Sequence, residues 1–299
     1  MILEPLAERR RLIVNTDAKN EADDQFAIVQ ALLSPSLDLR GIIPAHFGQR
    51  PDKGRTGLAD SRAEVDLILE LMGLEGAVRV ENGSEFRIPD LRTPMPSPGA
   101  ELIIEEALRD DCGPLFVAFL GPLTDMASAL MLEPEIARRE LTVVWIGGSP
   151  YGGVDAPYNP EFNLSNDVLA ANVVFGSDVQ VWQVPSSVYT MLSVSYAELE
   201  LRVKPHGRIG AYLARQLVAW NAAHARMPME YRSLGDSPAI GIVMNPNCGA
   251  SVMRPAPLFK ADCSYDFDNP GRPVRVFESI DQRFILEDLF AKLELFARP

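Results

Sequence analysis

The sequence predicts an α/β protein, because patterns of buried strands alternate along the chain with patterns of amphipathic helices. Residues 11–33 show the repeating unit: a short β-branched strand, an acidic turn, and a helix that a Ser-Pro pair ends. Residues 115–120 and 141–146 are continuous apolar runs, as buried parallel strands require. Parallel strands joined through helices end at one shared edge, so we expect the turns that follow them to meet there.

The remaining elements follow from the same patterns, taken in chain order. A second strand is expected at residues 39–45, and a helix from about residue 56 to residue 71 stops at Gly73. The proline-rich stretch 82–100 predicts a loop. Further on, the patterns predict a helix at 123–131, a long loop at 149–167, a strand at 179–184, and helices at 211–224 and 281–296.

The composition indicates a globular protein with a small-molecule partner. With 299 residues, 47% of them hydrophobic and 23% charged, the chain is expected to form a single domain, residues 1–299. A net charge of −13 and a pI near 4.8 argue against nucleic acid or an anionic membrane as a partner, because both bind basic surfaces. A small neutral or cationic ligand fits this charge better.

The sequence also bears on location and redox chemistry. The amino-terminal residues lack the apolar core of a signal peptide, and no apolar run approaches the length of a membrane span. We therefore expect a cytoplasmic protein. The three cysteines form no CxxC pair, so neither a disulfide framework nor a zinc site is suggested.

The turn after the first strand gathers the acids Asp17, Glu21, Asp23 and Asp24. In an α/β sheet, such a turn lies where ligands bind. Converging carboxylates repel one another unless a cation or a proton is shared between them. A hard divalent cation would relieve this repulsion: calcium takes six to eight oxygen ligands in irregular geometry, whereas magnesium prefers an octahedral shell. Alternatively, Asp23 and Asp24 serve only to cap the first turn of the following helix.

This turn resembles the Asp-x-Asp-Pro-Gly-x-Asp-Asp signature of the inosine/uridine-preferring nucleoside hydrolases. The second aspartate and the closing pair of the signature correspond to Asp17, Asp23 and Asp24. The sequence departs from the signature at its first acid, which is Asn15 here, and the turn is two residues longer.

Three later segments resemble the same family, in the family's order. Gly-Pro-Leu-Thr-Asp at 121–125 is similar to a Gly-Pro-Leu-Thr-Asn segment between a strand and a helix. Glu-Phe-Asn at 161–163 is similar to a family segment that precedes a helix, although Ser165 or Asp167 could equally make this stretch a simple helix cap. The segment 233–239 is similar to His-Asp-Pro-x-Ala, with Asp236 at the aspartate.

The resemblance implies an open, mostly parallel sheet flanked by helices, with a Rossmann-like core, and calcium-dependent hydrolysis of the N-glycosidic bond of ribonucleosides or related N-ribosides. It implies calcium ligands at Asp17, Asp24, Asp236 and the Leu120 carbonyl, with Asp17 also the general base. It further implies that Asp23, Glu161 and Asn163 hold sugar hydroxyls, and that the protein forms a homodimer or homotetramer.

One departure affects the chemistry directly. Gly235 stands where the family commonly has a histidine thought to protonate the leaving base. His46, just beyond the second strand, is the nearest replacement by topology, and His224 and Tyr231 flank the Asp236 segment. A competing hypothesis is therefore a non-catalytic, calcium-dependent protein that binds sugars or nucleosides.

A further alternative comes from the acid-rich first loop. A magnesium-dependent phosphatase or phosphotransferase would use an aspartate at the strand end as its nucleophile. Such an enzyme also needs a lysine from a later motif, which the order of segments does not supply.

Overall fold

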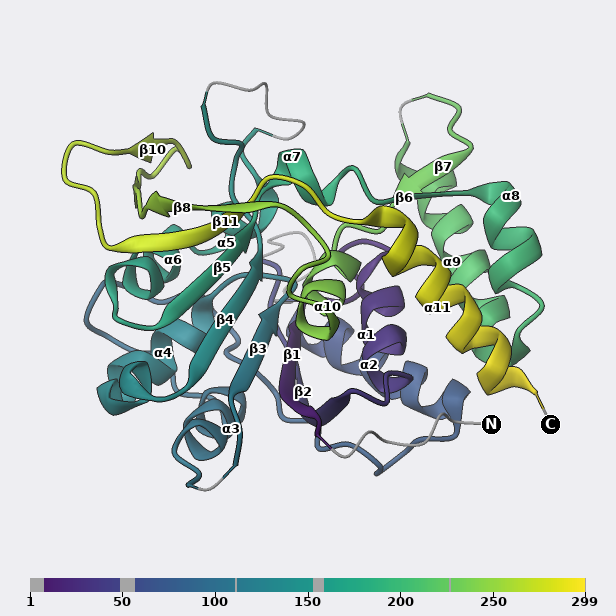
Figure 1. Cartoon of the computed structure of the whole chain (residues 1–299), viewed down its shortest axis with the longest axis horizontal. Coiled ribbons are helices and arrows are strands. Elements are labelled where there is room, and N and C mark those ends of the chain that lie inside the picture. The colour runs from purple at the N-terminus through teal and green to yellow at the C-terminus, as the bar shows by residue number, and fades with distance from the viewer. Residues whose placement is uncertain (1–7, 49–56, 111, 153–158, 226, 299) are drawn as a thin grey trace.

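The fold centres on a seven-stranded sheet of order β2-β1-β3-β4-β5-β11-β8, seen in the computed structural model (Figure 1). The structure describes residues 8–48, 57–110, 112–152, 159–225 and 227–298. Neighbouring strands pair in parallel except β11 with β8, which are antiparallel. The strands are β1 (Arg10–Thr16), β2 (Leu37–Pro44), β3 (Leu115–Phe119), β4 (Leu141–Ile146), β5 (Gln180–Val184), β8 (Ser251–Pro255) and β11 (Pro273–Phe277).

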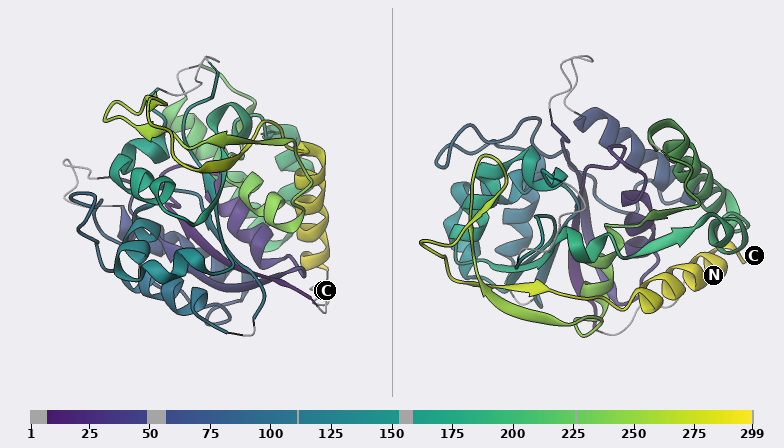
Figure 2. Two further views of the ribbon diagram at one scale, coloured as in Figure 1. Left: turned by 60° about the vertical axis from the view of Figure 1, so that its left-hand side comes forward. Right: turned by 90° about the horizontal axis from the view of Figure 1, so that it is seen from above.

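Two helical layers cover the two faces of the sheet, as the view from above in Figure 2 shows. One face carries α1 (Asp24–Leu32), α2 (Leu58–Met72), α9 (Gly207–His224), α10 (Ser237–Met244) and α11 (Gln282–Ala297). The other face carries α3 (Pro98–Ala107), α4 (Thr124–Leu132) and α6 (Val168–Gly176).

Shorter elements complete the described chain. The short helices are η1 (Pro134–Arg138), α5 (Phe162–Asn166), α7 (Ser186–Tyr189), α8 (Tyr196–Glu198) and η2 (Leu199–Val203). Two small antiparallel pairs are formed by β6 (Ser193–Ser195) with β7 (Tyr231–Ser233) and by β9 (Leu258–Phe259) with β10 (Tyr265–Asp266).

The strands are apolar on both sides because both faces of the sheet are buried. In β1, the side chains of Leu12 and Val14 pack under α1 and α10, whereas Ile13 packs into the other layer. Successive strand residues point to opposite faces, so one continuous apolar run supplies two hydrophobic cores. Among the described residues, no helix has both the length and the apolar character to cross a membrane.

The predicted α/β class with a mostly parallel sheet is confirmed, with differences in detail. Residues 82–100 are a loop only as far as Ser97, whose side chain accepts a hydrogen bond from the Ala100 N–H and caps α3. Pro98 is compatible with the first turn of a helix, so it does not extend the loop. The antiparallel strands β8 and β11 were not predicted. Residue 56, where a helix was expected to begin, lies outside the described residues, and α2 begins at Leu58.

Candidate active site

The carboxyl ends of the parallel strands gather the predicted acids, beginning with the turn between β1 and α1. Asp17 directly follows β1, and Asp23 and Asp24 lie where α1 begins. The Thr16 hydroxyl donates a hydrogen bond to Asp24 Oδ1, which ties the acid back to the strand end. A Cβ at Gly121 would lie 2.8 Å from Asp17 Cγ, so only glycine lets the β3–α4 turn approach this carboxyl group so closely.

Asp236 joins these acids from the start of α10, far away in sequence. Asp23, Asp24 and Asp236 each offer a carboxylate oxygen within 4.8 Å of the others, a group that can hold a metal ion. Asp17 Oδ2 is buried and, within the described residues, has no hydrogen-bond partner. The alternative that Asp23 and Asp24 act only as helix caps loses support, because Asp23, the N-cap residue, makes no side-chain capping bond.

Among the described residues, the buried carboxyl groups of the cluster outweigh the one nearby positive charge, Arg232, as expected of a cation site. Burial, with the neighbouring carboxylates, raises the pKa of Asp17 and Asp236 well above the ordinary value. Burial likewise raises the pKa of Asp23 to about 8 and that of Asp24 to about 7. An all-oxygen donor set of this kind fits a hard divalent cation such as calcium.

Glu161 and Asn163 lie opposite these acids at the ends of β3 and β4. Glu161 is the N-cap of α5 and accepts hydrogen bonds from the backbone N–H groups of Gly148, Asn163 and Leu164 and from the Tyr189 hydroxyl. The Asn163 side-chain amide donates to the carbonyls of Leu120, at 2.7 Å, and Ile146, at 2.9 Å. The predicted carbonyl ligand is thus already in contact with a predicted sugar-binding side chain.

Asp167 caps a helix, which is one of the alternatives that the sequence left open for the stretch around residues 161–167. Its side chain accepts a hydrogen bond from the Ala170 N–H at the start of α6. The stretch is therefore both a helix lead-in and part of the cavity wall, since Glu161 and Asn163 line the cavity whereas Asp167 caps the next helix.

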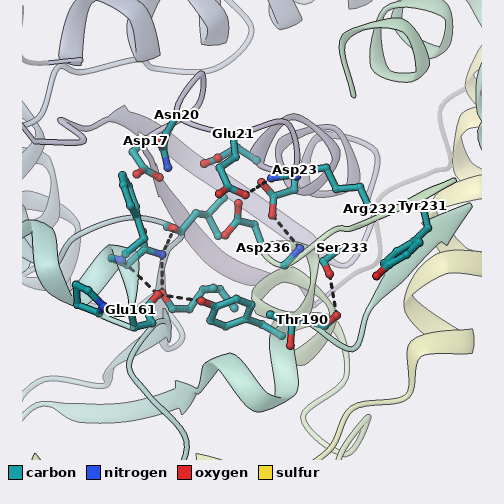
Figure 3. Close-up of a pocket in the computed structure, with 18 of the residues that line it drawn as sticks. Asp17, Asn20, Glu21, Asp23, Glu161, Thr190, Tyr231, Arg232, Ser233 and Asp236 are labelled. Atoms are coloured by element: carbon teal, nitrogen blue, oxygen red, sulfur yellow. Dashed lines mark hydrogen bonds and ion pairs between the residues drawn. The ribbon is translucent and has the colours of Figure 1, made fainter. Parts of the chain in front are cut away.

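These residues surround one cavity of about 280 Å³. Figure 3 shows Asp17 and Glu161 on one side of it, Tyr231 on the opposite side, and Asp23 and Asp236 between them. The predicted site residues that line this cavity are Asp17, Asp23, Asp24, Leu120, Glu161, Asn163 and Asp236.

Several lining residues were not predicted, among them Tyr189 and Arg232. The Tyr189 ring follows β5 at the same edge of the sheet, and its position just after a strand end was the available signal. Arg232 bonds through its guanidinium group to Glu21 and to Asn221 Oδ1, and it stacks 3.8 Å above the Trp220 ring. This arginine is therefore held to the cavity wall by its own partners.

The structure does not bring His46 into this cavity. The side chain is 2% exposed and lies beside a separate depression lined by Gly48 and Arg87, among others. Its Nδ1 atom accepts from the Gly48 N–H, and its Nε2 atom lies 2.9 Å from the Thr124 hydroxyl, which in turn donates to Asp167. These contacts fit a neutral imidazole, and burial lowers the pKa of His46 to about 4.

His224 is likewise absent from the cavity lining: it stacks on Trp220 and bonds to that residue's carbonyl through Nδ1. Tyr231, the third candidate proton donor, does line the cavity, with 52% of the residue exposed.

Two departures from the family motifs contact each other. Asn15 replaces the first acid of the signature, and Asp125 replaces the asparagine of the Gly-Pro-Leu-Thr-Asn segment. Asn15 Nδ2 donates to Asp125 Oδ2 at 2.9 Å, and Asp125 also accepts from Ser84 and Ser97. The acid and the amide have thus exchanged positions in the sequence, and in this chain they form a buried hydrogen-bonded pair.

A mostly parallel sheet with a buried, acidic, oxygen-rich cavity at the carboxyl ends of its strands defines an α/β protein that binds a small ligand at this edge. More specifically, the chain belongs to the inosine-uridine preferring nucleoside hydrolase family, whose family model matches residues 12–268. This assignment makes the protein an N-glycosyl hydrolase and removes the phosphatase alternative.

Individual relatives support the assignment. The chain is 26% identical over 238 residues to "Probable uridine nucleosidase 2" of Arabidopsis thaliana. The aligned region covers 73% of this chain and 72% of that protein. It is 30% identical over 174 residues to the "Pyrimidine-specific ribonucleoside hydrolase RihA" of Citrobacter koseri. This aligned region covers 53% of this chain and 55% of that protein.

Solved structures share the fold. The structure of "Plant nucleoside hydrolase - PpNRh1 enzyme" matches with a TM-score of 0.76 and 20% identity, over 95% of this chain and 99% of that chain. The "Purine-Preferring Ribonucleoside Hydrolase from Gardnerella vaginalis" matches with a TM-score of 0.75 and 21% identity, over 96% and 99%. The nucleoside hydrolase-like fold predicted from the sequence is confirmed.

Proposed function

We propose that this protein is a calcium-dependent hydrolase that cleaves the N-glycosidic bond of ribonucleosides or related N-ribosides, releasing a base and ribose. The observation that carries the proposal is the convergence of Asp17, Asp23, Asp24 and Asp236 in one buried cavity. Their raised pKa values indicate that the described part of the protein compensates the carboxylate charges only in part. A bound divalent cation would do so.

We assign the cation to Asp17, Asp24, Asp236 and the Leu120 carbonyl. Asp23 belongs to the same close group of carboxylates, which supports an additional contact with the cation or with a sugar hydroxyl bound to it. When bound, calcium would hold the 2′- and 3′-hydroxyls of the ribose and acidify the attacking water.

The protein's own groups then carry the proton and hold the sugar. Asp17 is the proposed general base, because its Oδ2 atom, although buried, has no hydrogen-bond partner among the described residues and can take a proton from water. The oxocarbenium-like transition state requires the sugar to be fixed while the bond to the base lengthens. Glu161 and Asn163 form the wall on that side and are the proposed contacts for the outer hydroxyls.

The test is release of reducing sugar from a panel of purine and pyrimidine ribonucleosides, with added calcium and with a chelator. The proposal predicts release that the chelator abolishes and calcium restores. If no nucleoside or N-riboside is cleaved while calcium still raises the melting temperature, the protein is instead a calcium-dependent binding protein. Release that persists after thorough chelation would contradict the role of the cation.

Some expectations from the sequence remain proposals. The sheet takes β1 and β11 from opposite ends of the chain, which supports a single domain over residues 1–299. The cytoplasmic location and the homodimer or homotetramer stay predictions.

A further inference from the structure

The wall of the cavity around Gly235 leaves little room for a side chain. The Gly235 N–H donates to Asp23 Oδ2 at 2.9 Å. A Cβ at this position would lie 3.0 Å from the Tyr189 ring and 3.2 Å from Asp23 Oδ2. Tyr189 is itself held by its hydroxyl bond to Glu161 at 2.9 Å. A side chain here would require the anchored Tyr189 ring or the Asp23 carboxyl group to shift by a few tenths of an ångström.

The same wall offers few proton donors for a leaving group. None of the three histidines is among the residues that line the described part of the cavity. The Tyr189 hydroxyl already donates to Glu161, and the Arg232 guanidinium is bonded to Glu21 and Asn221. Among the described lining residues, Tyr231 is a second phenol, and it is more exposed than Tyr189. A neutral base, which leaves as an anion unless it is protonated, therefore finds little assistance from the described lining residues.

The charge of the cavity favours a cation. Among the described lining residues, carboxyl groups outnumber positive groups six to one: the acids are Asp17, Glu21, Asp23, Asp24, Glu161 and Asp236, and the single positive group is Arg232. Arg232 is paired with Glu21, and a divalent cation would offset only two further charges. A cleft lined by one sign of charge concentrates ligands of the opposite sign.

Aromatic rings supply a second attraction for a positively charged ring. Phe162, Tyr189 and Tyr231 all line the cavity. The face of an aromatic ring attracts a cation, most strongly where water is excluded. The Tyr189 residue is only 8% exposed, so at least one of these rings is well shielded from water.

We infer that the preferred substrate is an N-riboside whose leaving ring already carries a positive charge, of the N-ribosylpyridinium class. The inference rests on the proposed hydrolase activity and specifies its substrate. In the step, the bond between the anomeric carbon and the ring nitrogen breaks, and its electron pair stays on nitrogen, so a neutral pyridine leaves without a proton. Water adds to the anomeric carbon, and its proton passes to Asp17. The products are ribose, a neutral pyridine and one proton.

The test compares kcat/KM for nicotinamide riboside, p-nitrophenyl riboside, uridine and inosine, all with calcium. The leaving groups of nicotinamide riboside and p-nitrophenyl riboside both depart without a proton, but only nicotinamide riboside is cationic. The ratio of their kcat/KM values therefore reports the effect of the substrate's charge once intrinsic reactivity has been corrected for. To correct for reactivity, each rate is divided by the uncatalysed rate of the same substrate. We expect the corrected value for nicotinamide riboside to exceed that for p-nitrophenyl riboside by about tenfold or more, in line with a shielded cation–π contact and an acidic cavity.

The salt dependence and one variant complete the test. Raising the ionic strength should increase KM for nicotinamide riboside and leave KM for p-nitrophenyl riboside nearly unchanged. Equal corrected values for the two activated substrates would overturn the inference. It would also be overturned if uridine were turned over faster than nicotinamide riboside and the Tyr231→Phe variant lost uridine turnover, because Tyr231 would then protonate a neutral leaving base. In both cases the proposed hydrolase function would stand. If none of the four substrates is cleaved, the proposed function itself fails, and the inference fails with it.

Discussion

Buried carboxyl groups lie at both ends of strand β1, but their charges are balanced in different ways. At the amino end, Glu106 accepts from Arg11 at 2.6 Å, from Arg40 at 3.0 and 3.1 Å, and from Arg109 at 3.2 Å. Burial acts to raise the pKa of Glu106, but the bonds from Arg40 and Arg11 outweigh it and lower the pKa to about 2. The protein supplies every positive charge that this carboxylate needs.

At the carboxyl end of the same strand, the acids have no such cationic partners among the residues that the structure describes. Arg232, which lines the cavity, pairs with Glu21, and burial raises the pKa values of Asp17, Asp23, Asp24 and Asp236. A buried carboxylate that the chain has paired contributes to the fold, whereas buried carboxylates left unpaired indicate a site that a ligand completes. The contrast leads to four predictions.

The largest effect is expected for Asp17→Asn, which keeps the shape of the side chain and removes its charge. Loss of a positioned general base should reduce kcat by at least about 100-fold. Because the substitution also relieves repulsion among carboxylates, the calcium-free variant should melt no lower than the calcium-free wild-type protein. Steady-state kinetics and thermal melting measure the two effects. Undiminished activity would remove Asp17 from its role.

Glu106→Gln is the matched control at the other end of the strand. Removing one partner of a buried ion pair leaves Arg11 and Arg40 without their counter-charge, so we expect a loss of about 3 kcal/mol in the free energy of unfolding. The folded variant should keep its kcat, because Glu106 does not line the cavity. Urea denaturation and kinetics check this. If Glu106→Gln lost activity without losing stability, the contrast between the two ends would be wrong.

The pH dependence of stability should also separate calcium-free from calcium-bound protein. The pKa values of Asp24 and Asp23 rise from 3.8 to about 7 and about 8 on folding, so the folded state holds protons that the unfolded state has lost. The calcium-free protein should therefore lose stability as the pH rises from about 4 to 8. Calcium replaces those protons, so it should raise the melting temperature more at pH 8 than at pH 5. An equal increase at both pH values would contradict the assignment of these acids.

The smallest effect is expected for His46→Ala, measured as kcat. His46 resembles Glu106 in being fully bonded by the protein, through Gly48 and Thr124. Any loss of activity should be equal for uridine and for an activated nitrophenyl riboside, since neither meets the imidazole. A selective loss for uridine would restore the proton-donor role predicted from the sequence.

Much of the site could be predicted from the sequence, because the sheet determines where strand ends meet. Asp17 follows a strand, and Asp236 begins a late helix, so a shared edge brings them together although they lie far apart in sequence. The same rule could not place His46 correctly relative to the cavity. The residue does follow β2 at this edge, but its side chain turns toward Thr124 of α4, and side-chain direction depends on packing that the strand pattern does not encode.

Local features also explain why β8 and the position of Tyr189 were not predicted from the sequence. β8 is an edge strand whose Val252 and Met253 are exposed, so its sequence lacks the apolar run that marked the central strands. Tyr189 enters the cavity from a short helix after β5, and its contact with Gly235 joins segments with no shared motif. Contacts of this kind become visible only in three dimensions.

The most direct test of the central claim is a calcium titration by isothermal titration calorimetry on chelator-treated protein. The account predicts a single calcium site per chain in the wild-type protein and in Glu106→Gln, and loss of that site in Asp236→Asn. An Asp236→Asn variant that binds calcium as tightly as the wild-type protein, or a wild-type protein that binds none, would contradict the claim that these buried acids are completed by a cation.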